Sequence, residues 1–225
     1  MTQEKKNYTL PIIMMIMLFG MISFVTGLQN PMGIIVKSQF GASNLMATLG
    51  YAANFIAYAF MGIPAGFLLQ RIGYKKTALA AIIVGFVGVG IQYFSGIAES
   101  FAIYLIGAFV AGFSMCMLNT VVNPMLNTLG GGGNKGNQLI QIGGSFNSLN
   151  ATIVPVLVGY LIGSNVSTAT IQDANPALFL ALGIFALAFI VLFFVNIPEP
   201  RQTVSEKTAE KNEHSALSFR HFKLG

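Results

Sequence analysis

Amide side chains are the most prominent polar groups within the long uncharged segments of this sequence. Asn119, Asn123 and Asn127 follow one another at intervals of four residues, which places them on one face of a helix. An amide that faced lipid would leave its donors and acceptors unpaired, at a cost of several kcal/mol. Such a stripe must therefore face protein or a watery cavity. The amides that we predict to bind a substrate are Gln29, Asn30, Asn119, Asn123, Gln141 and Asn147.

These amides suit a neutral ligand that is rich in hydroxyl groups, such as a sugar. Asn and Gln each present a donor and an acceptor, as a hydroxyl group does. A metal ion or a cationic ligand normally requires carboxylates, and an anionic substrate requires Lys or Arg. The apolar segments offer neither, so no metal site, cofactor or catalytic residue is predicted. For any single amide, a hydrogen bond to a neighbouring helix remains the alternative role.

The uncharged segments predict an all-α membrane protein. Hydrophobic residues make up 54% of the chain and charged residues only 8%, whereas soluble proteins carry about 25% charged residues. This composition disfavours a soluble enzyme and a nucleic-acid-binding domain. Each charge-free stretch exceeds the roughly 20 residues that a helix needs to cross a bilayer. The predicted transmembrane helices lie near 9–36, 45–69, 77–95, 101–128, 137–163 and 175–196.

The basic residues predict the orientation of these helices. If the N-terminus is cytoplasmic, the cytoplasmic segments are 1–8, 70–76, 129–136 and 197–225. They hold eleven of the twelve Lys and Arg residues, and Lys37 is the exception. This positive-inside pattern predicts a multi-pass protein of the plasma membrane, in a bacterium the inner membrane, with both termini cytoplasmic. The net charge of +5 then reflects orientation and does not indicate a nucleic-acid partner.

A short internal repeat predicts that the bundle, residues 9–196, consists of two groups of three helices. Asn30-Pro31-Met32 in the first predicted helix recurs as Asn123-Pro124-Met125 in the fourth. Transporters with inverted three-plus-three repeats show weak symmetry of this kind. Proline within each span also loosens the backbone hydrogen bonding, as expected for helices that line a cavity.

The segment 66–76 resembles the signature loop of the major facilitator superfamily, Gly-x-x-x-Asp-x-x-Gly-x-Arg/Lys-Arg/Lys. Gln70 replaces the usual Asp, so the ionic brace that this Asp provides in the superfamily is missing at that position. The resemblance implies that this loop takes part in gating on the cytoplasmic side. The gating-loop residues are Gly66, Arg71, Gly73, Lys75 and Lys76.

Two further segments, 119–124 and 144–148, resemble motifs of the fucose permease and glucose/galactose transporter family. That family has twelve helices in two six-helix halves. The resemblance therefore implies that the chain is the N-terminal half, with 197–225 as a cytoplasmic linker to a missing C-terminal half. It also implies secondary active transport of a neutral hexose, such as glucose, galactose or fucose, by alternating access and ion-coupled symport.

The family's functional residues are only partly retained. The resemblance places Asn30 and Asn119 where fucose-permease-type members have acids for proton coupling and sugar contact. It identifies Asn147 as a retained sugar-contact amide, whereas Gly144 replaces the usual Gln. Because asparagine cannot carry a proton, three alternatives stay open. Coupling to H+ resides in the missing half, another ion such as Na+ is coupled through amide and carbonyl oxygens, or the protein is a uniporter.

Other functions are compatible with six spans. Water and glycerol channels also contain two Asn-Pro motifs, but there the motifs lie in half-helix loops and are followed by Ala. Here each motif is followed by Met, at Met32 and Met125, and lies within a predicted span. A non-transporting membrane subunit and a self-assembling half-transporter are the remaining alternatives. An enzyme is disfavoured, because both histidines, His214 and His221, lie outside the predicted spans.

Overall fold

The computed structural model describes residues 8–163, 166–195 and 197, and the regular secondary structure in this part is helical. All six helices, of 20 to 32 residues, are long and apolar enough to cross a membrane. The prediction of an all-α protein with six spans is therefore confirmed. The helices are α1 (Thr9–Phe40), α2 (Asn44–Ile72), α3 (Tyr74–Ile97), α4 (Phe101–Leu129), α5 (Gly133–Ile162) and α6 (Asn175–Phe194).

Several helices extend beyond the uncharged segments that predicted them. α1 continues past Lys37 and ends at Gly41, whose φ of 58° is left-handed. α2 then begins after Ser43, whose side chain accepts a hydrogen bond from the Met46 backbone N–H. A charge marks where a span leaves the apolar part of the bilayer, but the helix itself ends only where a backbone signal stops it.

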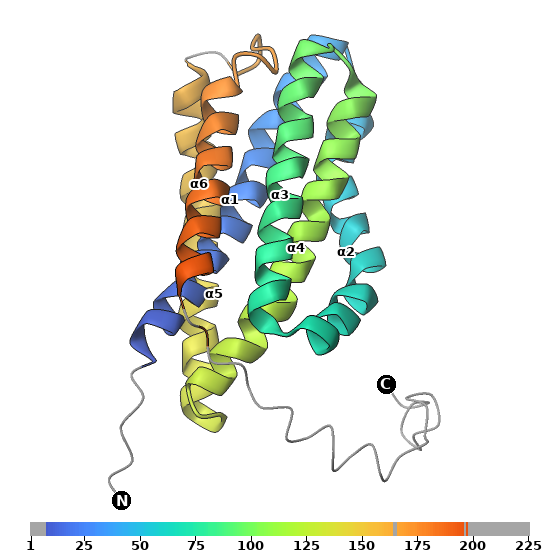
Figure 1. Ribbon diagram of the computed structural model, residues 1–225. Helices are drawn as coiled ribbons and strands as arrows, with labels where there is room; N and C mark the ends of the chain where they lie inside the picture. Colours follow the sequence, from blue (N-terminus) through green and yellow to red (C-terminus); the bar gives the residue numbers. More distant parts are fainter. Residues whose placement is uncertain (1–7, 164–165, 196, 198–225) are drawn as a thin grey trace, which may run out of the picture.

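The helices run alternately up and down, so that successive turns lie at opposite ends of the bundle (Figure 1). The α2–α3 and α4–α5 turns share one end with the start of α1 and the end of α6. We call this the basic end, because Arg71, Lys75, Lys76 and Lys135 lie at these turns. Lys37 lies near the end of α1, at the opposite end of the bundle.

Part of the helix packing agrees with the predicted three-plus-three repeat, whereas the extensive α3–α4 contact has only a weak counterpart between α6 and α1. α4 packs against α2 and α3, α1 packs against α5, and α3 packs against α6. If α1–α3 are matched in order to α4–α6, the α2–α4 contact corresponds to the α5–α1 contact. Prolines also occur in matched helices, at Pro31 and Pro124 in α1 and α4, and at Pro64 and Pro155 in α2 and α5.

Burial differs sharply between the helices. In the most hydropathic 18-residue window of α1 and α4, 61% and 56% of the residues are buried, against 17% in α2 and 11% in α5. α1 and α4 therefore form the centre of the bundle, whereas α2 and α5 leave much of their surface uncovered. Of the predicted terminal segments, 1–8 and 197–225, only Tyr8 and Ile197 fall within the described residues.

Candidate functional site

The amide of Asn119 is held in place by a neighbouring helix. Its Nδ2 donates a hydrogen bond of 3.0 Å to the hydroxyl oxygen of Tyr58, which joins α4 to α2. Both side chains are half-buried. No further hydrogen bond of this amide occurs among the described residues, so Oδ1 and the second N–H are left for a ligand.

The next amide of the stripe, Asn123, also serves its own helix. Its Nδ2 donates to the backbone carbonyl of Asn119, one turn earlier, at 3.0 Å. One turn further on, the hydroxyl of Thr128 donates to the carbonyl of Pro124 at 2.9 Å. These side-chain bonds reach backbone carbonyls near Pro124, whose missing N–H leaves the Thr120 carbonyl without its usual helical donor. For a ligand, Asn123 therefore has its side-chain Oδ1 as an acceptor and the second N–H of Nδ2 as a donor.

Gln29 is almost completely buried, with 1% of its surface exposed. The hydroxyl of Tyr104 in α4 donates to its Oε1 at 3.0 Å. The Nε2 of Gln29 is buried and has no hydrogen-bond partner. Tyr104 itself fills the space beside Gly50, where a Cβ would come within 2.6 Å of the tyrosine oxygen. A glycine in α2 thus allows Tyr104 to reach Gln29 in α1.

Gln29 and the exposed Asn30 line a pocket of about 510 Å³ between α1 and α2. This α1–α2 pocket lies in the part of the bundle away from the basic end, because α1 ends and α2 begins there. Its walls combine amides, a hydroxyl, an aromatic ring and one ammonium group. The polar and aromatic members besides the two amides of α1 are Lys37, Asn44, Thr48 and Tyr51.

The two predicted residues of α5 point to different sides of this helix. Gln141 and Asn147 are six residues apart, and six residues correspond to about one and two-thirds turns. Gln141 is exposed and lines a shallow polar pocket with Ser145 and Ser148. Asn147 is half-buried, and its Oδ1 is buried without a hydrogen-bond partner. Gln141 therefore lies on an open polar face, whereas Asn147 faces protein.

The six predicted residues fall into separate groups, in the α1–α2 pocket, on α4 and on the two sides of α5. No pocket described in this part of the chain contains members of all the groups. The residues that connect or extend them, Tyr58, Tyr104 and Tyr51, were not predicted. Aromatic residues four and three positions apart, as at Tyr51, Phe55 and Tyr58, are a weak signal for a shared helix face, whereas the sequence carries no signal for the Tyr104 contact.

A sequence model of the Major Facilitator Superfamily matches residues 12–224 of this chain. The chain belongs to the major facilitator superfamily. This membership confirms the resemblance of the α2–α3 segment to the superfamily's signature loop. It also favours a transporter over a channel and over a non-transporting subunit.

Individual members of the superfamily are similar over a large part of the chain. The glucose/galactose transporter of Brucella abortus (biovar 1, strain 9-941) is 30% identical over 227 residues, which cover 100% of this chain and 55% of the relative. The L-fucose-proton symporter of Escherichia coli (strain K12) is 24% identical over 72% of this chain and 37% of the relative.

The fold is also that of a solved transporter of the superfamily. The crystal structure of FucP in its outward conformation matches with a TM-score of 0.70 and 18% identity, over 85% of this chain and 50% of FucP. The chain thus spans about half the length of FucP and of the Brucella relative. This coverage agrees with the expected N-terminal six-helix half of the superfamily fold.

The superfamily's signature loop is short here and is attached to α6. Gly73 is the only residue between α2 and α3, and its φ of 83° favours glycine. Lys75 donates from Nζ to the backbone carbonyl of Phe193 at 2.8 Å, where α6 ends. A lysine at a helix C-terminus stabilises the carbonyls there. Arg71 and Lys76 are exposed, and the gating role of the loop stays a prediction.

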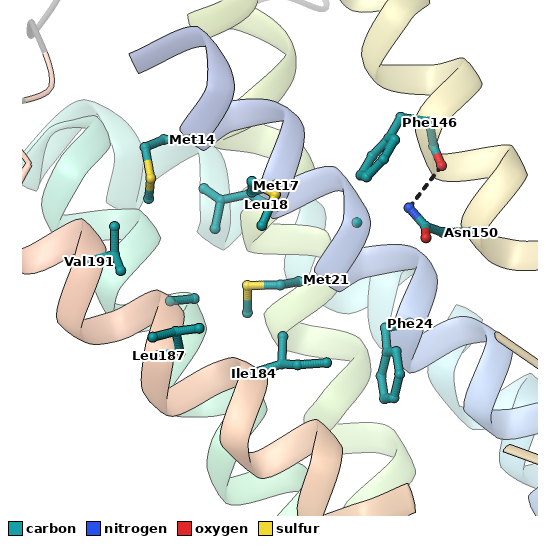
Figure 2. A pocket seen from close by; sticks show the side chains of 12 residues that line it. Met14, Met17, Leu18, Met21, Phe24, Phe146, Asn150, Ile184, Leu187 and Val191 are labelled. Carbon is teal, nitrogen blue, oxygen red and sulfur yellow. Dashed lines mark hydrogen bonds between the residues drawn. The ribbon is translucent and has the colours of Figure 1, made fainter. Parts of the chain in front are cut away.

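Another pocket contains none of the six predicted amides and is largely apolar. It has a volume of about 290 Å³ and is enclosed by α1, α5 and α6 (Figure 2). Met14, Met21 and Phe24 form much of the α1 side. The Nδ2 of Asn150, in the wall, already donates to the backbone carbonyl of Phe146 at 3.1 Å. Walls of this kind offer little to recognise sugar hydroxyls, so we do not place the substrate there.

Proposed function

We propose that this bundle is the N-terminal half of a secondary transporter that carries a neutral hexose across the bacterial inner membrane by alternating access. The observation that carries the proposal is the Asn119 amide, which Tyr58 orients from across the α2–α4 contact. The names of the Brucella and E. coli relatives, a glucose/galactose transporter and an L-fucose-proton symporter, support a sugar as the substrate class.

The oriented amide suits a sugar hydroxyl group in particular. With one N–H of Asn119 bonded to Tyr58, the amide cannot rotate freely, so Oδ1 accepts and the second N–H donates in fixed directions. Asn147, whose Oδ1 is buried without a partner, supplies a second amide from α5. Neither residue is charged, which matches a neutral ligand and avoids the cost of desolvating an ion.

We further propose that transport is coupled to protons through a group outside the described residues. The two acids in the described part, Glu99 and Asp173, both lie in connections between helices and not within them. Asn30 and Asn119 cannot take up a proton at physiological pH. The E. coli relative is named a proton symporter, which favours H+ over Na+.

The basic end is proposed to face the cytoplasm, with both termini on that side. Arg71, Lys75, Lys76 and Lys135 lie at its turns, as the positive-inside rule requires of cytoplasmic connections. The end that holds Lys37 and the α1–α2 pocket then faces outward.

Uptake of radiolabelled glucose, galactose and fucose into vesicles tests the proposal in the full-length transporter. Asn119→Ala and Asn147→Ala are expected to lower uptake of the transported sugar by about tenfold or more, which corresponds to the loss of one or two ligand hydrogen bonds. Asn134→Ala, in the exposed first turn of α5, is the matched control and should transport like the parent.

The coupling ion is tested by applying pH and sodium gradients separately to the same vesicles. Accumulation driven by the pH gradient alone is expected. Accumulation driven only by sodium would refute proton coupling. Unchanged uptake in both Asn119→Ala and Asn147→Ala, at equal amounts in the membrane, would refute the site assignment.

A further inference from the structure

We propose that the α1–α2 pocket is a second, outer carbohydrate subsite, which binds the neutral sugar before the sugar reaches Asn119. The ligand class rests on the proposed function, whereas the subsite itself rests on its own geometry. The pocket volume of about 510 Å³ falls within the roughly 300–1,000 Å³ of small-molecule sites.

Gln29 supplies the first recognition group. Its Nε2 is buried without a protein partner, although Gln29 lines the pocket. The hydroxyl of Tyr104 fixes the opposite end of the amide at 3.0 Å and so determines where the free N–H groups lie. A buried donor without an acceptor is costly. A sugar hydroxyl in the pocket would accept from this donor.

The other walls supply what a sugar ring needs. Tyr51 exposes 41% of its surface and offers an aromatic face against which the C–H side of a pyranose ring can stack. Asn30 and Asn44 add amide donors and acceptors, and Thr48 donates to the Leu45 carbonyl while its oxygen can still accept. The ammonium group of Lys37 is the one charged group in the lining and can donate to sugar hydroxyl groups. An aromatic face beside these donors and acceptors is suited to a carbohydrate.

A row of rings connects this pocket with the Asn119 amide. The centroids of Tyr51 and Phe55 are 4.9 Å apart, and those of Phe55 and Tyr58 are 6.0 Å apart. The spacing of four and then three residues places the three rings on one side of α2. The hydroxyl oxygen of Tyr58 in turn accepts the hydrogen bond from Nδ2 of Asn119. The row therefore leads from the outer subsite to the inner site.

The two sites are too far apart to hold one sugar ring together. Tyr51 and Tyr58 are separated by seven residues, and seven residues of helix rise by about 10 Å. This separation exceeds the length of a single pyranose ring. A hexose therefore contacts the outer subsite and the inner site one after the other, with Phe55 between them.

Protection of an introduced cysteine tests the subsite in the full-length transporter. Thr48→Cys places a thiol in the pocket, in a Cys116→Ala background that removes the cysteine of this chain. Leu45→Cys is the matched control, because Leu45 is 74% exposed on the same first turn of α2 and outside the pocket. A membrane-impermeant maleimide is added from outside, with glucose, galactose or fucose as the protecting ligand.

The transported sugar is expected to slow labelling of Thr48→Cys by about fivefold or more, while labelling of Leu45→Cys stays unchanged. Protection should persist when Asn119→Ala is added, because the outer subsite does not need the inner amide. Tyr51→Leu should raise the half-protecting sugar concentration about tenfold, and Tyr51→Phe, which keeps the ring, should restore the parent value.

The outcomes separate this inference from the proposed function. Uptake by the parent without protection of Thr48→Cys overturns the subsite and leaves the transport function standing. Protection that disappears with Asn119→Ala also overturns it, because the sugar then acts from the inner site. Protection without uptake supports the subsite and refutes the transport function. Absence of both refutes both.

Discussion

The α2–α4 and α1–α5 contacts correspond to each other in the three-plus-three repeat. They are nevertheless built from different side chains. The α2–α4 contact is polar. Besides Tyr58 and Asn119, the buried Asn54 donates from Nδ2 to the carbonyl of Ala108 at 3.1 Å. Directional bonds of this kind fix both the rotation and the register of two helices, so the fold itself orients the amide of Asn119.

The α1–α5 contact relies on close approach between glycines and apolar side chains. Gly27 faces Val154, Gly20 faces Phe146, and on α5 Gly143 faces Phe19. Within a bilayer, such small residues allow the van der Waals contact that holds helices together. The α2–α4 contact thus orients the Asn119 amide through directional hydrogen bonds, whereas the α1–α5 contact holds its two helices together by close packing.

The largest effect on stability is expected when a side chain is added at Gly112, the glycine in the α2–α4 contact with the closest neighbouring atom. At Gly112 a Cβ would meet the backbone oxygen of Asn54 at 2.5 Å, so α2 and α4 must separate. At Gly20 the nearest atom, at 2.9 Å, is the ring edge of Phe146, which can turn away. We expect Gly112→Ala to destabilise the fold by about 2–3 kcal/mol and Gly20→Ala by less than about 1 kcal/mol.

Thermal unfolding of the two variants in the same detergent measures this difference. If both variants lowered the unfolding midpoint by the same small amount, the α2–α4 contact would be as adaptable as the α1–α5 contact, and the difference between the two contacts would be refuted.

The next largest effect is expected at Tyr104 of α4, which takes part in the α2–α4 contact at Gly50 and also bonds to Gln29 in α1. Tyr104→Phe keeps the ring but leaves both ends of the buried Gln29 amide without a hydrogen bond. We expect a loss of about 1–2 kcal/mol in unfolding free energy. The same change should weaken sugar protection of Thr48→Cys. Tyr104→Phe combined with Gln29→Leu should recover stability but not protection, and recovery of both would contradict the role of Gln29.

A smaller effect on stability is expected for Tyr58→Phe. The interhelical bond to Asn119 is only half-buried, and such bonds contribute about 0.6 kcal/mol in membrane proteins. Its loss frees the Asn119 amide to rotate, so the KM for sugar should rise about tenfold while the thermal midpoint hardly moves. Tyr160→Phe, at a tyrosine that is 84% exposed on α5, is the control. Equal KM values in all three proteins would remove Tyr58 from the site.

The sequence predicts the elements of this fold well and the contacts between them poorly. Charges that lie only in connections and near helix ends reveal the six spans, because an ion within lipid is costly whatever the fold. Periodicity shows that Asn119 and Asn123 share a face of α4, but it does not give the rotation of α2 that brings Tyr58 to that face. The Tyr104–Gln29 bond likewise depends on a close approach at Gly50, which only the assembled helices show.

The same limit explains why the six predicted amides do not form one site. A helical period specifies a direction around an axis, not the depth in the membrane or the partner on the next helix. Gln29 is buried and Asn119 is bonded to a neighbouring helix, yet the two residues belong to different groups. The gating loop could be recognised from its motif, whereas the bond from Lys75 to the end of α6 could not.

The smallest effect is expected in a connection between helices. The α2–α3 and α5–α6 connections occupy equivalent places in the two repeats but differ in length. Gly73 alone joins α2 to α3, whereas the connection between α5 and α6 is longer. We call residues 166–174 of this connection the clasp. In this clasp the backbone N–H of Ile171 donates to Oε1 of Gln39 at 2.8 Å, which ties the connection to α1. Hydrogen bonds from the backbone N–H of Thr170, at 2.7 Å, and from its hydroxyl, at 2.8 Å, hold the pKa of Asp173 below its ordinary value.

Because the folded state lowers this pKa, the ionised Asp173 stabilises the clasp at neutral pH. That contribution is lost as the pH falls through the lowered pKa, and exposure to solvent keeps it small. The parent should therefore unfold at a slightly higher temperature than Asp173→Asn at pH 7. This difference should shrink as the pH falls below about 4, the ordinary pKa of an Asp side chain, towards the lowered pKa of Asp173. A difference that persists unchanged at the lower pH would show that the clasp depends on the shape of the side chain and not on its charge.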